Sequence, residues 1–326
     1  MSKETKPQSF YPLDTLPPTS SHTSDLTSFL TQLTRMSASW PERAAVKKPE
    51  LDFDGLYQDE LPDFLISLLP FKDHPDFTMA PYDLQQRVLS CGWLAYNEKT
   101  ISVETKIIAP ACLHVVHGEI SGLTDEVARE AMSQVFVDEA YHTLLLVNAC
   151  RVTRQRRGLE FLRFPEFTLI RETRDQIAMY TEPWKKILMQ LVCATVSEVS
   201  ISDYLSLLSG ATSIQPLNMM TTEIHRRDES AHAGIFKKIS QMSYSALSRT
   251  ERDFFVKNLA KPLAWFSSWE LTVWQSLLTQ IKFPNADQII QDCRSASEYD
   301  LTTRDFSALS ELMVSLGLDV NSDLEL

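Results

Sequence analysis

The sequence predicts an all-α fold, and three observations support this. Only 8 of the 326 residues are glycine, which is few for an α/β protein, because its turns and phosphate-binding loops consume glycine. Apolar residues follow helical spacing far more often than the strict alternation of a strand. Two Glu-x-x-His motifs, Glu139–His142 and Glu229–His232, each lie in a long segment with this helical spacing. We therefore expect one mainly helical domain.

Residues 1–23 are polar and are expected to form a flexible tail, followed by a single domain over 24–326. Start and stop signals then set the helices. The expected helices are a short one after Ser24, a small one near 61–69, a long one from Asp83 that bends or ends at Pro110, one from Thr124 to Arg154, one near 168–179, one from Pro183 to Leu208, one from Pro216, and one after Ser248 that is kinked or split at Pro262.

Individual residues justify these limits. Pro183 suits the first turn of a helix, and Gly210 suits a C-terminal cap. Ser248 and Glu251 have the spacing of a capping box. The region of His114 and His117 and the basic segment 154–158 are expected to be turns or loops. Trp265, Trp269 and Trp274 are expected to form one core stripe.

The net charge is −12 and no basic block occurs, which argues against nucleic-acid binding. No apolar run is expected to span a bilayer, and residues 1–24 lack the apolar core of a signal peptide. We therefore expect a soluble, cytoplasmic protein that does not act at membranes. The five cysteines are scattered among mostly apolar residues, which predicts reduced core thiols.

The Glu-x-x-His motifs indicate a metal site. Residues three apart share one face of a helix, so each motif directs a carboxylate and an imidazole the same way. Two such helices, with one more Glu from each of two others, form the di-metal carboxylate core of a ferritin-like helical bundle. The alternative is a Glu and a His that are satisfied by hydrogen bonds in the core.

The bundle needs two further carboxylates. Glu104 has isoleucines on its face and is favoured over Glu98, which lies among polar residues. Glu198 is framed by apolar residues and is favoured over Asp203. Either Glu could instead pair with an Arg. His225 shares a stripe with the second motif and offers a third imidazole, unless it is a supporting or surface histidine.

The expected metal ligands lie in a core spanning about 82–275, and no catalytic residue beyond them is proposed. Four carboxylates balance the charge of two ferrous ions. Mixed carboxylate and imidazole ligation suits iron, with manganese possible by mis-loading. The ligand set is Glu104, Glu139, His142, Glu198, His225, Glu229 and His232.

These residues give the chain a resemblance to the di-iron N-oxygenase family typified by p-aminobenzoate N-oxygenase. The resemblance covers roughly 80–275, and its specific part is the additional histidine, since that family has seven protein ligands. It rests on Asn97–Thr100, Glu104, Pro110–Cys112, Asp138–His142, Glu198 and His225–His232. It implies that a small-molecule amine is oxidised with O₂, to the hydroxylamine, nitroso, nitro or N-oxide level, in secondary-metabolite biosynthesis. It also suggests a homodimer.

The sequence leaves open the electron donor, the substrate and the roles of two tyrosines. An external electron donor is expected, because the sequence contains no flavin or nicotinamide fingerprint. A basic residue such as Lys99, Arg87 or Arg171 would favour an amine that carries a carboxylate. Tyr141 and Tyr180 are candidate pocket or redox residues, although ordinary packing explains them as well.

Three other functions are alternatives to N-oxygenation. A desaturase-like oxidase would not require His225. A protein like the small subunit of ribonucleotide reductase would usually have Asp where this chain has Glu104. Iron storage is the non-enzyme alternative, and storage bundles are much shorter than this chain.

Overall fold

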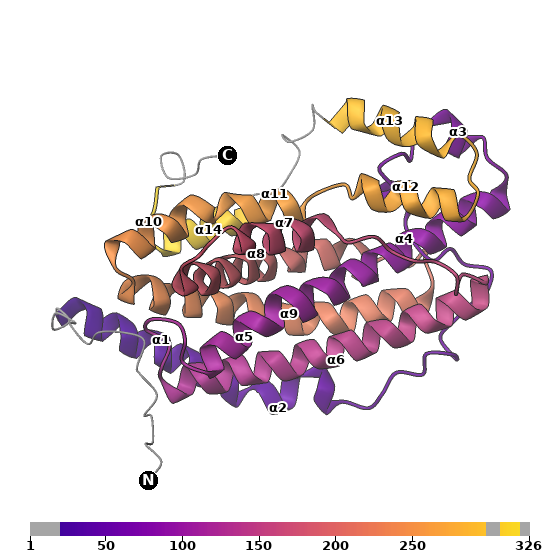
Figure 1. Cartoon of the computed structure of the whole chain (residues 1–326). Helices are drawn as coiled ribbons and strands as arrows, with labels where there is room; N and C mark the ends of the chain where they lie inside the picture. The colour runs from indigo at the N-terminus through magenta and orange to yellow at the C-terminus, as the bar shows by residue number, and fades with distance from the viewer. Residues whose placement is uncertain (1–19, 298–306, 320–326) are drawn as a thin grey trace, which may run out of the picture.

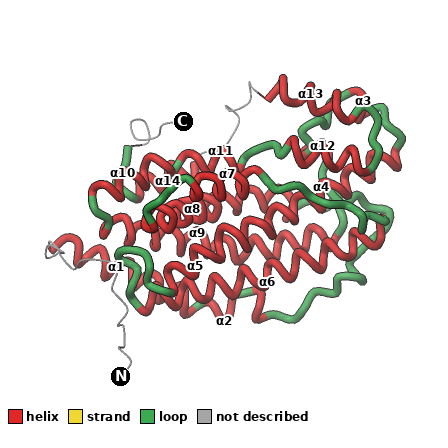
Figure 2. The backbone as a smooth tube through the Cα atoms, in the orientation of Figure 1, coloured by secondary structure: helices red, strands yellow, loops and turns green. Residues whose placement is uncertain are grey.

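The computed structural model describes residues 20–297 and 307–319, and these residues contain helices and no strand (Figures 1 and 2). The expected tail lies almost wholly outside the described residues, so the division into a tail and one domain stays a prediction. The longer helices are α1 (Ser20–Ala38), α4 (Tyr82–Val103), α6 (Glu126–Arg157), α7 (Thr168–Ala178), α8 (Pro183–Ser209), α9 (Pro216–Ala246), α10 (Arg249–Asn258), α12 (Leu271–Gln280) and α13 (Ala286–Ser297). The all-α prediction is confirmed.

Short elements connect or cover these helices. They are α2 (Trp40–Arg43), the 3₁₀ turns η1 (Ala45–Lys47) and η2 (Ile66–Leu68), α3 (Pro75–Thr78), the π-helical turn η3 (Glu104–Ile108), α5 (Ala109–Val116), α11 (Ala260–Phe266) and α14 (Ser307–Ser315). α1 begins at Ser20, five residues before the start that was expected directly after Ser24. In place of the small helix expected near 61–69, only η2 forms.

Four long helices make the bundle. α8 packs along α9, while α6 packs against α4, α5 and α9 (Figure 1). α7, α10 and α11 cover α8, and α1 packs on α6 and α9. Buried side chains from most of these helices form one large hydrophobic core. The helices α3, α12 and α13 lie together at one end of the bundle (Figure 1).

Pro110 does not end the first long helix. The chain continues from α4 through the π-helical turn η3 into α5, and Pro110 occupies the first turn of α5. Pro110 cannot donate the hydrogen bond that a regular α-helix would send to the carbonyl of Lys106, and Gln190 Nε2 instead donates to the carbonyls of Lys106 and Ile107, at 3.3 and 2.8 Å. His114 therefore lies in a helix and not in the expected turn. π-helical turns often occur at functional sites, and this one begins at Glu104.

α6 is longer than expected at its C-terminal end. Asp125 caps its first turn by accepting a hydrogen bond from the N–H of Val127. The basic segment that we expected to be a loop continues the helix to Arg157. Gly158 then ends it with a left-handed φ of 61°, a conformation that glycine adopts without strain. The arginines near this end favour the helix, because they interact well with the negative end of its dipole.

α8 corrects the expectation that no segment is long and apolar enough to cross a membrane. Its length and composition meet that criterion, but 71% of its most apolar stretch is buried inside the bundle. A core helix of a bundle has this composition, since it is covered on all sides. α8 begins at Pro183, and Gly210 follows its last residue, as predicted.

After α9, the next helix starts where the sequence predicts, but the chain then follows a different path from the one expected. The capping box of Ser248 and Glu251 is present. The helix is divided before Pro262, which lies in the first turn of α11. Trp265 lies in α11 and Trp274 in α12, whereas Trp269 lies between the two helices and is 40% exposed. The expectation of one tryptophan core stripe is therefore wrong.

All five cysteines are free thiols, and four of them are buried. The prediction of reduced core thiols is confirmed.

Candidate metal centre

The seven predicted ligands come together in the middle of the bundle. Glu104 comes from the junction of α4 and η3, two residues come from α6, one comes from α8, and three come from α9. None of these side chains is more than 2% exposed; they are Glu104, Glu139, His142, Glu198, His225, Glu229 and His232. Such burial of charged groups is costly unless each group has a partner.

The first group consists of Glu104, His142, His225 and Glu229, whose ligand atoms all lie within 4.8 Å of one another. His225 Nε2 lies 3.0 Å from Glu104 Oε1 and 3.0 Å from Glu229 Oε1. His142 Nδ1 lies 3.3 Å from Glu229 Oε1. His225 therefore points into the cluster and is not a surface residue.

The second group consists of Glu139, His142, Glu229 and His232. His232 Nδ1 lies 2.9 Å from Glu139 Oε1 and 3.4 Å from Glu229 Oε1. Glu198 completes this end, with Oε2 3.9 Å from His232 Nδ1. Because both groups share His142 and Glu229, they describe two adjacent positions for cations.

The geometry of the cluster fits metal ions better than hydrogen bonds. His232 Nδ1 and Glu139 Oε1 are close, yet neither atom has a partner in hydrogen-bond geometry. The same holds for Nδ1 of His142 and Oε2 of Glu229. Buried polar atoms without hydrogen bonds are rare. A cation between these atoms would satisfy them, and a set of nitrogen and oxygen ligands suits iron or manganese.

The carboxyl groups of the cluster differ in acidity. Burial raises the pKa of Glu104, and burial together with the charge of Glu229 raises the pKa of Glu198 well above its usual value. Burial also opposes ionisation of Glu229 itself. The neighbouring His232 and His142 outweigh that effect and hold the pKa of Glu229 well below its usual range. Without metal, Glu104 and Glu198 therefore tend to bind protons.

The histidines carry protons as well. Burial opposes a charge on His142, but the hydrogen bond between its Nε2 and Asp228 and the negative charge of the nearby Glu139 raise its pKa well above the usual value. For His232, burial is likewise outweighed, by the charge of Glu229 and by hydrogen bonding to Asp138. Metal binding must displace the protons that these groups hold on the metal-facing side.

These pKa directions predict that metal affinity rises with pH. Protons on the carboxyl groups of Glu104 and Glu198 and on Nδ1 of His142 and His232 compete with the cation, and they leave as the pH rises. Between about pH 6 and pH 8 we expect the apparent affinity for Fe²⁺ to rise by roughly tenfold or more. Anaerobic titration against a chelator at several pH values measures this, and an affinity that falls with pH would contradict it.

Two aspartates support the histidines, and each comes from the opposite motif helix. Asp138, next to Glu139, lies 3.1 Å from Nε2 of His232. Asp228, next to Glu229, lies 3.2 Å from Nε2 of His142. With the proton held on Nε2, each Nδ1 presents its lone pair to the cluster. Sequence reasoning did not assign this role, although both motifs show the signal of an Asp directly before the Glu.

The segment from α2 to η1 holds these aspartates in place. Trp40 Nε1 donates to both carboxylate oxygens of Asp138, at 2.9 and 3.0 Å. The backbone N–H of Ala45 donates to Asp228 at 3.0 Å, and Arg43 Nη1 lies 3.5 Å from the same side chain. The N-terminal segment thus fixes the orientation of both imidazoles through their aspartates.

Replacing Asp138 or Asp228 with Asn should weaken metal binding by about 10–100-fold, which is the usual loss when a partner of a metal-bound histidine is removed. The side chain keeps its size but no longer fixes the imidazole proton on Nε2. Competitive chelator titration measures the change. As a control, Asp292→Asn alters an exposed aspartate that pairs with His74 far along the chain, and it should leave the affinity unchanged. Equal affinities in all three variants would contradict the role.

The other candidates from the sequence, two carboxylates and two tyrosines, are not among the residues of the cluster. Glu98 pairs with Arg154 at 2.8 Å, so it is the structural carboxylate. The side chain of Asp203 lies outside the described residues. Tyr180 packs edge-on against Phe254. Tyr141 is half-buried on α6 and is not part of the cluster.

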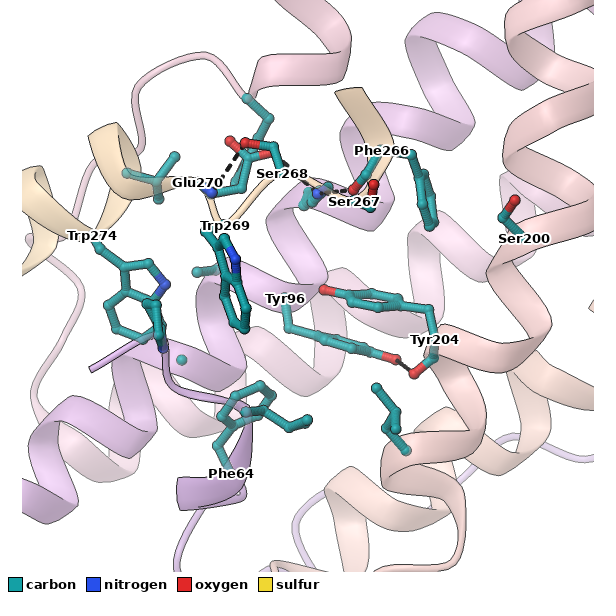
Figure 3. Close-up of a pocket in the computed structure, with 18 of the residues that line it drawn as sticks. Phe64, Tyr96, Ser200, Tyr204, Phe266, Ser267, Ser268, Trp269, Glu270 and Trp274 are labelled. Carbon is teal, nitrogen blue, oxygen red and sulfur yellow. Dashed lines mark hydrogen bonds and ion pairs between the residues drawn. The ribbon is translucent and has the colours of Figure 1, made fainter. Parts of the chain in front are cut away.

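A pocket of about 510 Å³ is lined by residues of α4, α8 and the region from α11 to α12 (Figure 3). α4 and α8, the helices that lead to Glu104 and carry Glu198, supply part of its wall, and the segment between α11 and α12 supplies another part. Of its residues, the sequence indicated only Lys99 as a candidate for the substrate pocket, and it placed Trp269 and Trp274 in the core. Its aromatic side chains are Phe64, Tyr96, Phe167, Tyr204, Phe266, Trp269 and Trp274.

Comparison with known proteins shows the family of this chain. The family described as p-aminobenzoate N-oxygenase AurF matches residues 30–317. The 4-aminobenzoate N-oxygenase of Streptomyces thioluteus is 33% identical over 296 residues, which cover 90% of this chain and 88% of the relative. The matched region includes all seven residues of the cluster. The chain therefore belongs to the p-aminobenzoate N-oxygenase family and is an oxygenase.

Proposed function

We propose that this chain is a di-iron monooxygenase that uses O₂ to oxidise the amine nitrogen of a small molecule. The observation that carries this proposal is the convergence of seven buried carboxylate and imidazole side chains in two adjacent groups. Membership of a family of N-oxygenases supports the type of reaction. The product would stand at the hydroxylamine, nitroso, nitro or N-oxide level.

Two iron ions would be held by the seven side chains. Glu104 and His225 would serve the ion of the first group, and Glu139, Glu198 and His232 that of the second. His142 and Glu229 belong to both groups; the carboxylate of Glu229 could serve both ions, whereas the one free nitrogen of His142, Nδ1, could serve only one. When bound, the iron pair supplies the redox chemistry that activates O₂. Manganese could enter the same site by mis-loading.

The residues of the chain have three tasks in this reaction. The packed helices exclude bulk water from the cluster, which strengthens the electrostatic interactions within it. Asp138 and Asp228 hold a proton on Nε2 of the two histidines, so that each Nδ1 stays available to metal. The pocket along α4 and α8 would hold the amine, which must be uncharged so that its nitrogen presents a lone pair.

We further propose that electrons come from an external donor, that the protein forms a homodimer and that it acts in the cytoplasm. The net charge of −12 supports a small-molecule enzyme over a nucleic-acid-binding protein. Size-exclusion chromatography with light scattering tests the dimer, because a monomer or a large storage shell would elute at a clearly different mass.

The central test measures iron and product together. The protein is loaded with Fe²⁺ and reduced, and it is then exposed to ¹⁸O₂ with a panel of aryl and aliphatic amines. We expect about two irons per chain and at least one amine that gains ¹⁸O on nitrogen by mass spectrometry. A protein that binds no iron would overturn the proposed metal centre. A di-iron protein that labels carbon and never nitrogen would overturn the proposed reaction.

A further inference from the structure

We propose that the pocket along α4 and α8 binds the substrate, and that it selects an aromatic amine that lacks a free carboxylate. The inference rests on the proposed function, because it assigns a substrate class to the same reaction. Four observations support it: the position of the pocket, its aromatic walls, the internal ion pair of Lys99 and Glu270, and the backbone that holds Glu270.

The pocket runs along two of the helices that carry predicted metal ligands. Lys99 lines it and lies five residues before Glu104, so the two residues are about 7.5 Å apart along the helix axis. Ser200, on the opposite wall, lies two residues after Glu198. Both walls of the pocket are thus extensions of helices that carry predicted ligands. A volume of about 510 Å³ is within the usual range for a small-molecule site.

The walls suit a flat aromatic molecule. Tyr96 and Tyr204 stack with ring centroids 4.4 Å apart and an interplanar angle of 13° (Figure 3). The hydroxyl of Tyr96 donates to the backbone carbonyl of Tyr204, which fixes the pair. Trp269 and Phe266 present further ring faces to the same space (Figure 3). Aromatic side chains that line a pocket favour stacked or edge-on contact with the ring of a ligand.

Lys99 is the one lysine among the residues that line the pocket, and Glu270 balances its charge. Lys99 Nζ lies 3.0 Å from Glu270 Oε1 and donates to the backbone carbonyl of Phe266 at 2.7 Å. Both charged side chains are largely buried, with exposures of 7% for Lys99 and 11% for Glu270. At such burial the pair acts as one uncharged unit with a donor side and an acceptor side.

Glu270 is held firmly in this position. Its Oε2 accepts hydrogen bonds from the backbone N–H and the hydroxyl of Thr168, each at 3.0 Å. Its backbone is left-handed, with a φ of 51°, which is uncommon for a residue with a side chain and persists only where the surroundings enforce it. Glu270 therefore does not move aside when a ligand approaches Lys99.

A free carboxylate on the substrate would meet this fixed carboxylate. An anion at Lys99 would have to share the ammonium with Glu270 in a dry pocket, and like charges at such distances repel strongly. An uncharged polar group, such as a carboxamide, can instead accept from Lys99 and donate to Glu270. The relative named above is a 4-aminobenzoate N-oxygenase, so this chain is expected to prefer an uncharged counterpart of that substrate.

Binding to the metal-free protein tests the preference without requiring turnover. Trp269 and Trp274 line the pocket, so quenching of tryptophan fluorescence reports occupancy. The probes are 4-aminobenzoate and 4-aminobenzamide, which differ only in the group opposite the amine. We expect the amide to bind at least tenfold more tightly than the acid at pH 7. Equal or tighter binding of the acid would overturn the inference.

The variant Glu270→Gln tests the role of the carboxylate charge directly. Gln keeps an oxygen for Thr168 but removes the charge that balances Lys99, so the ratio of amide to acid affinity should fall at least tenfold. The double variant K99M/E270Q should lose that gain for the acid. Glu311→Gln, which changes a glutamate that pairs with Lys237 at the surface, is the matched control and should keep the wild-type ratio. An unchanged ratio in E270Q would also overturn the inference.

The ¹⁸O₂ assay then separates the two proposals. If the amide is bound more tightly and gains oxygen on nitrogen, both stand. If the amide binds more tightly but no amine is oxidised by the iron-loaded protein, the proposed function fails while the affinity order remains. If 4-aminobenzoate is bound more tightly and oxidised, the proposed function stands and the selection against carboxylates fails.

Discussion

Replacing Glu229 with alanine should remove most of the bound iron and reduce amine oxidation by more than about 100-fold. Loss of a residue that merely supports a ligand already reduces affinity or activity by roughly 10–100-fold, and Glu229 belongs to both groups of the cluster. Its Oε1 lies 3.0 Å from His225 Nε2 and 3.3 Å from His142 Nδ1. Iron per chain and product from a single turnover measure the two effects.

Two other variants on α9 serve as comparisons for Glu229→Ala. His225 belongs to one group only, so His225→Ala should lose less iron than Glu229→Ala. Glu223 pairs with Arg226 outside the cluster, so Glu223→Ala should bind iron as the wild type does. Circular dichroism confirms that each variant is helical. Retention of two irons and of activity within about tenfold in Glu229→Ala would show that the metal is held elsewhere.

The sequence could predict the ligand candidates because their spacing is local. Glu139 and His142 are three residues apart, and helical geometry alone places them on one face. Glu104 was favoured over Glu98 because its neighbours are apolar, and the structure buries Glu104 while Glu98 pairs with Arg154. In each case the deciding information lies within two helical turns.

The supporting contacts could not be predicted in this way. His232 and Asp138 are 94 residues apart, and His142 and Asp228 are 86 apart. Only the packing of α6 against α9 brings each aspartate to the opposite histidine. The pocket is harder to predict still, because its walls come from five separate stretches of the chain. Lys99 could be named as a candidate, but its neutralisation depends on Glu270, which is remote in sequence.

The errors in the fold have local physical causes. Pro110 was expected to bend or end a helix, yet the chain stays helical through it, because a π-helical turn precedes it and Gln190 donates to the neighbouring backbone carbonyls. The arginines before Gly158 suggested a loop, although basic residues favour the last turn of a helix. The run of tryptophans suggested one stripe, but the break after α11 turns Trp269 outward into the pocket wall. These are differences in where helices end, and the bundle itself does not depend on them.

Replacing Trp93 with alanine should lower the free energy of unfolding by about 3–5 kcal/mol, the usual range for deleting a large buried aromatic side chain. Trp93 is fully buried on α4, and its ring is parallel to that of Tyr96, with centroids 6.1 Å apart. A typical domain is stable by only about 5–15 kcal/mol, so the loss is a large share of the total. Urea unfolding of the metal-free protein, followed by circular dichroism, measures it.

Two further variants separate stability from binding. Trp93→Phe keeps a ring and removes an indole N–H that has no hydrogen-bond partner, so it should destabilise the protein much less than Trp93→Ala. Trp269 is 40% exposed and lines the pocket, so Trp269→Ala should change stability by no more than about 0.5 kcal/mol while weakening amine binding. If Trp269→Ala were as destabilising as Trp93→Ala, the pocket would be part of the structural core. It could then not accept a ligand without unfolding, and the site of amine binding would have to lie elsewhere.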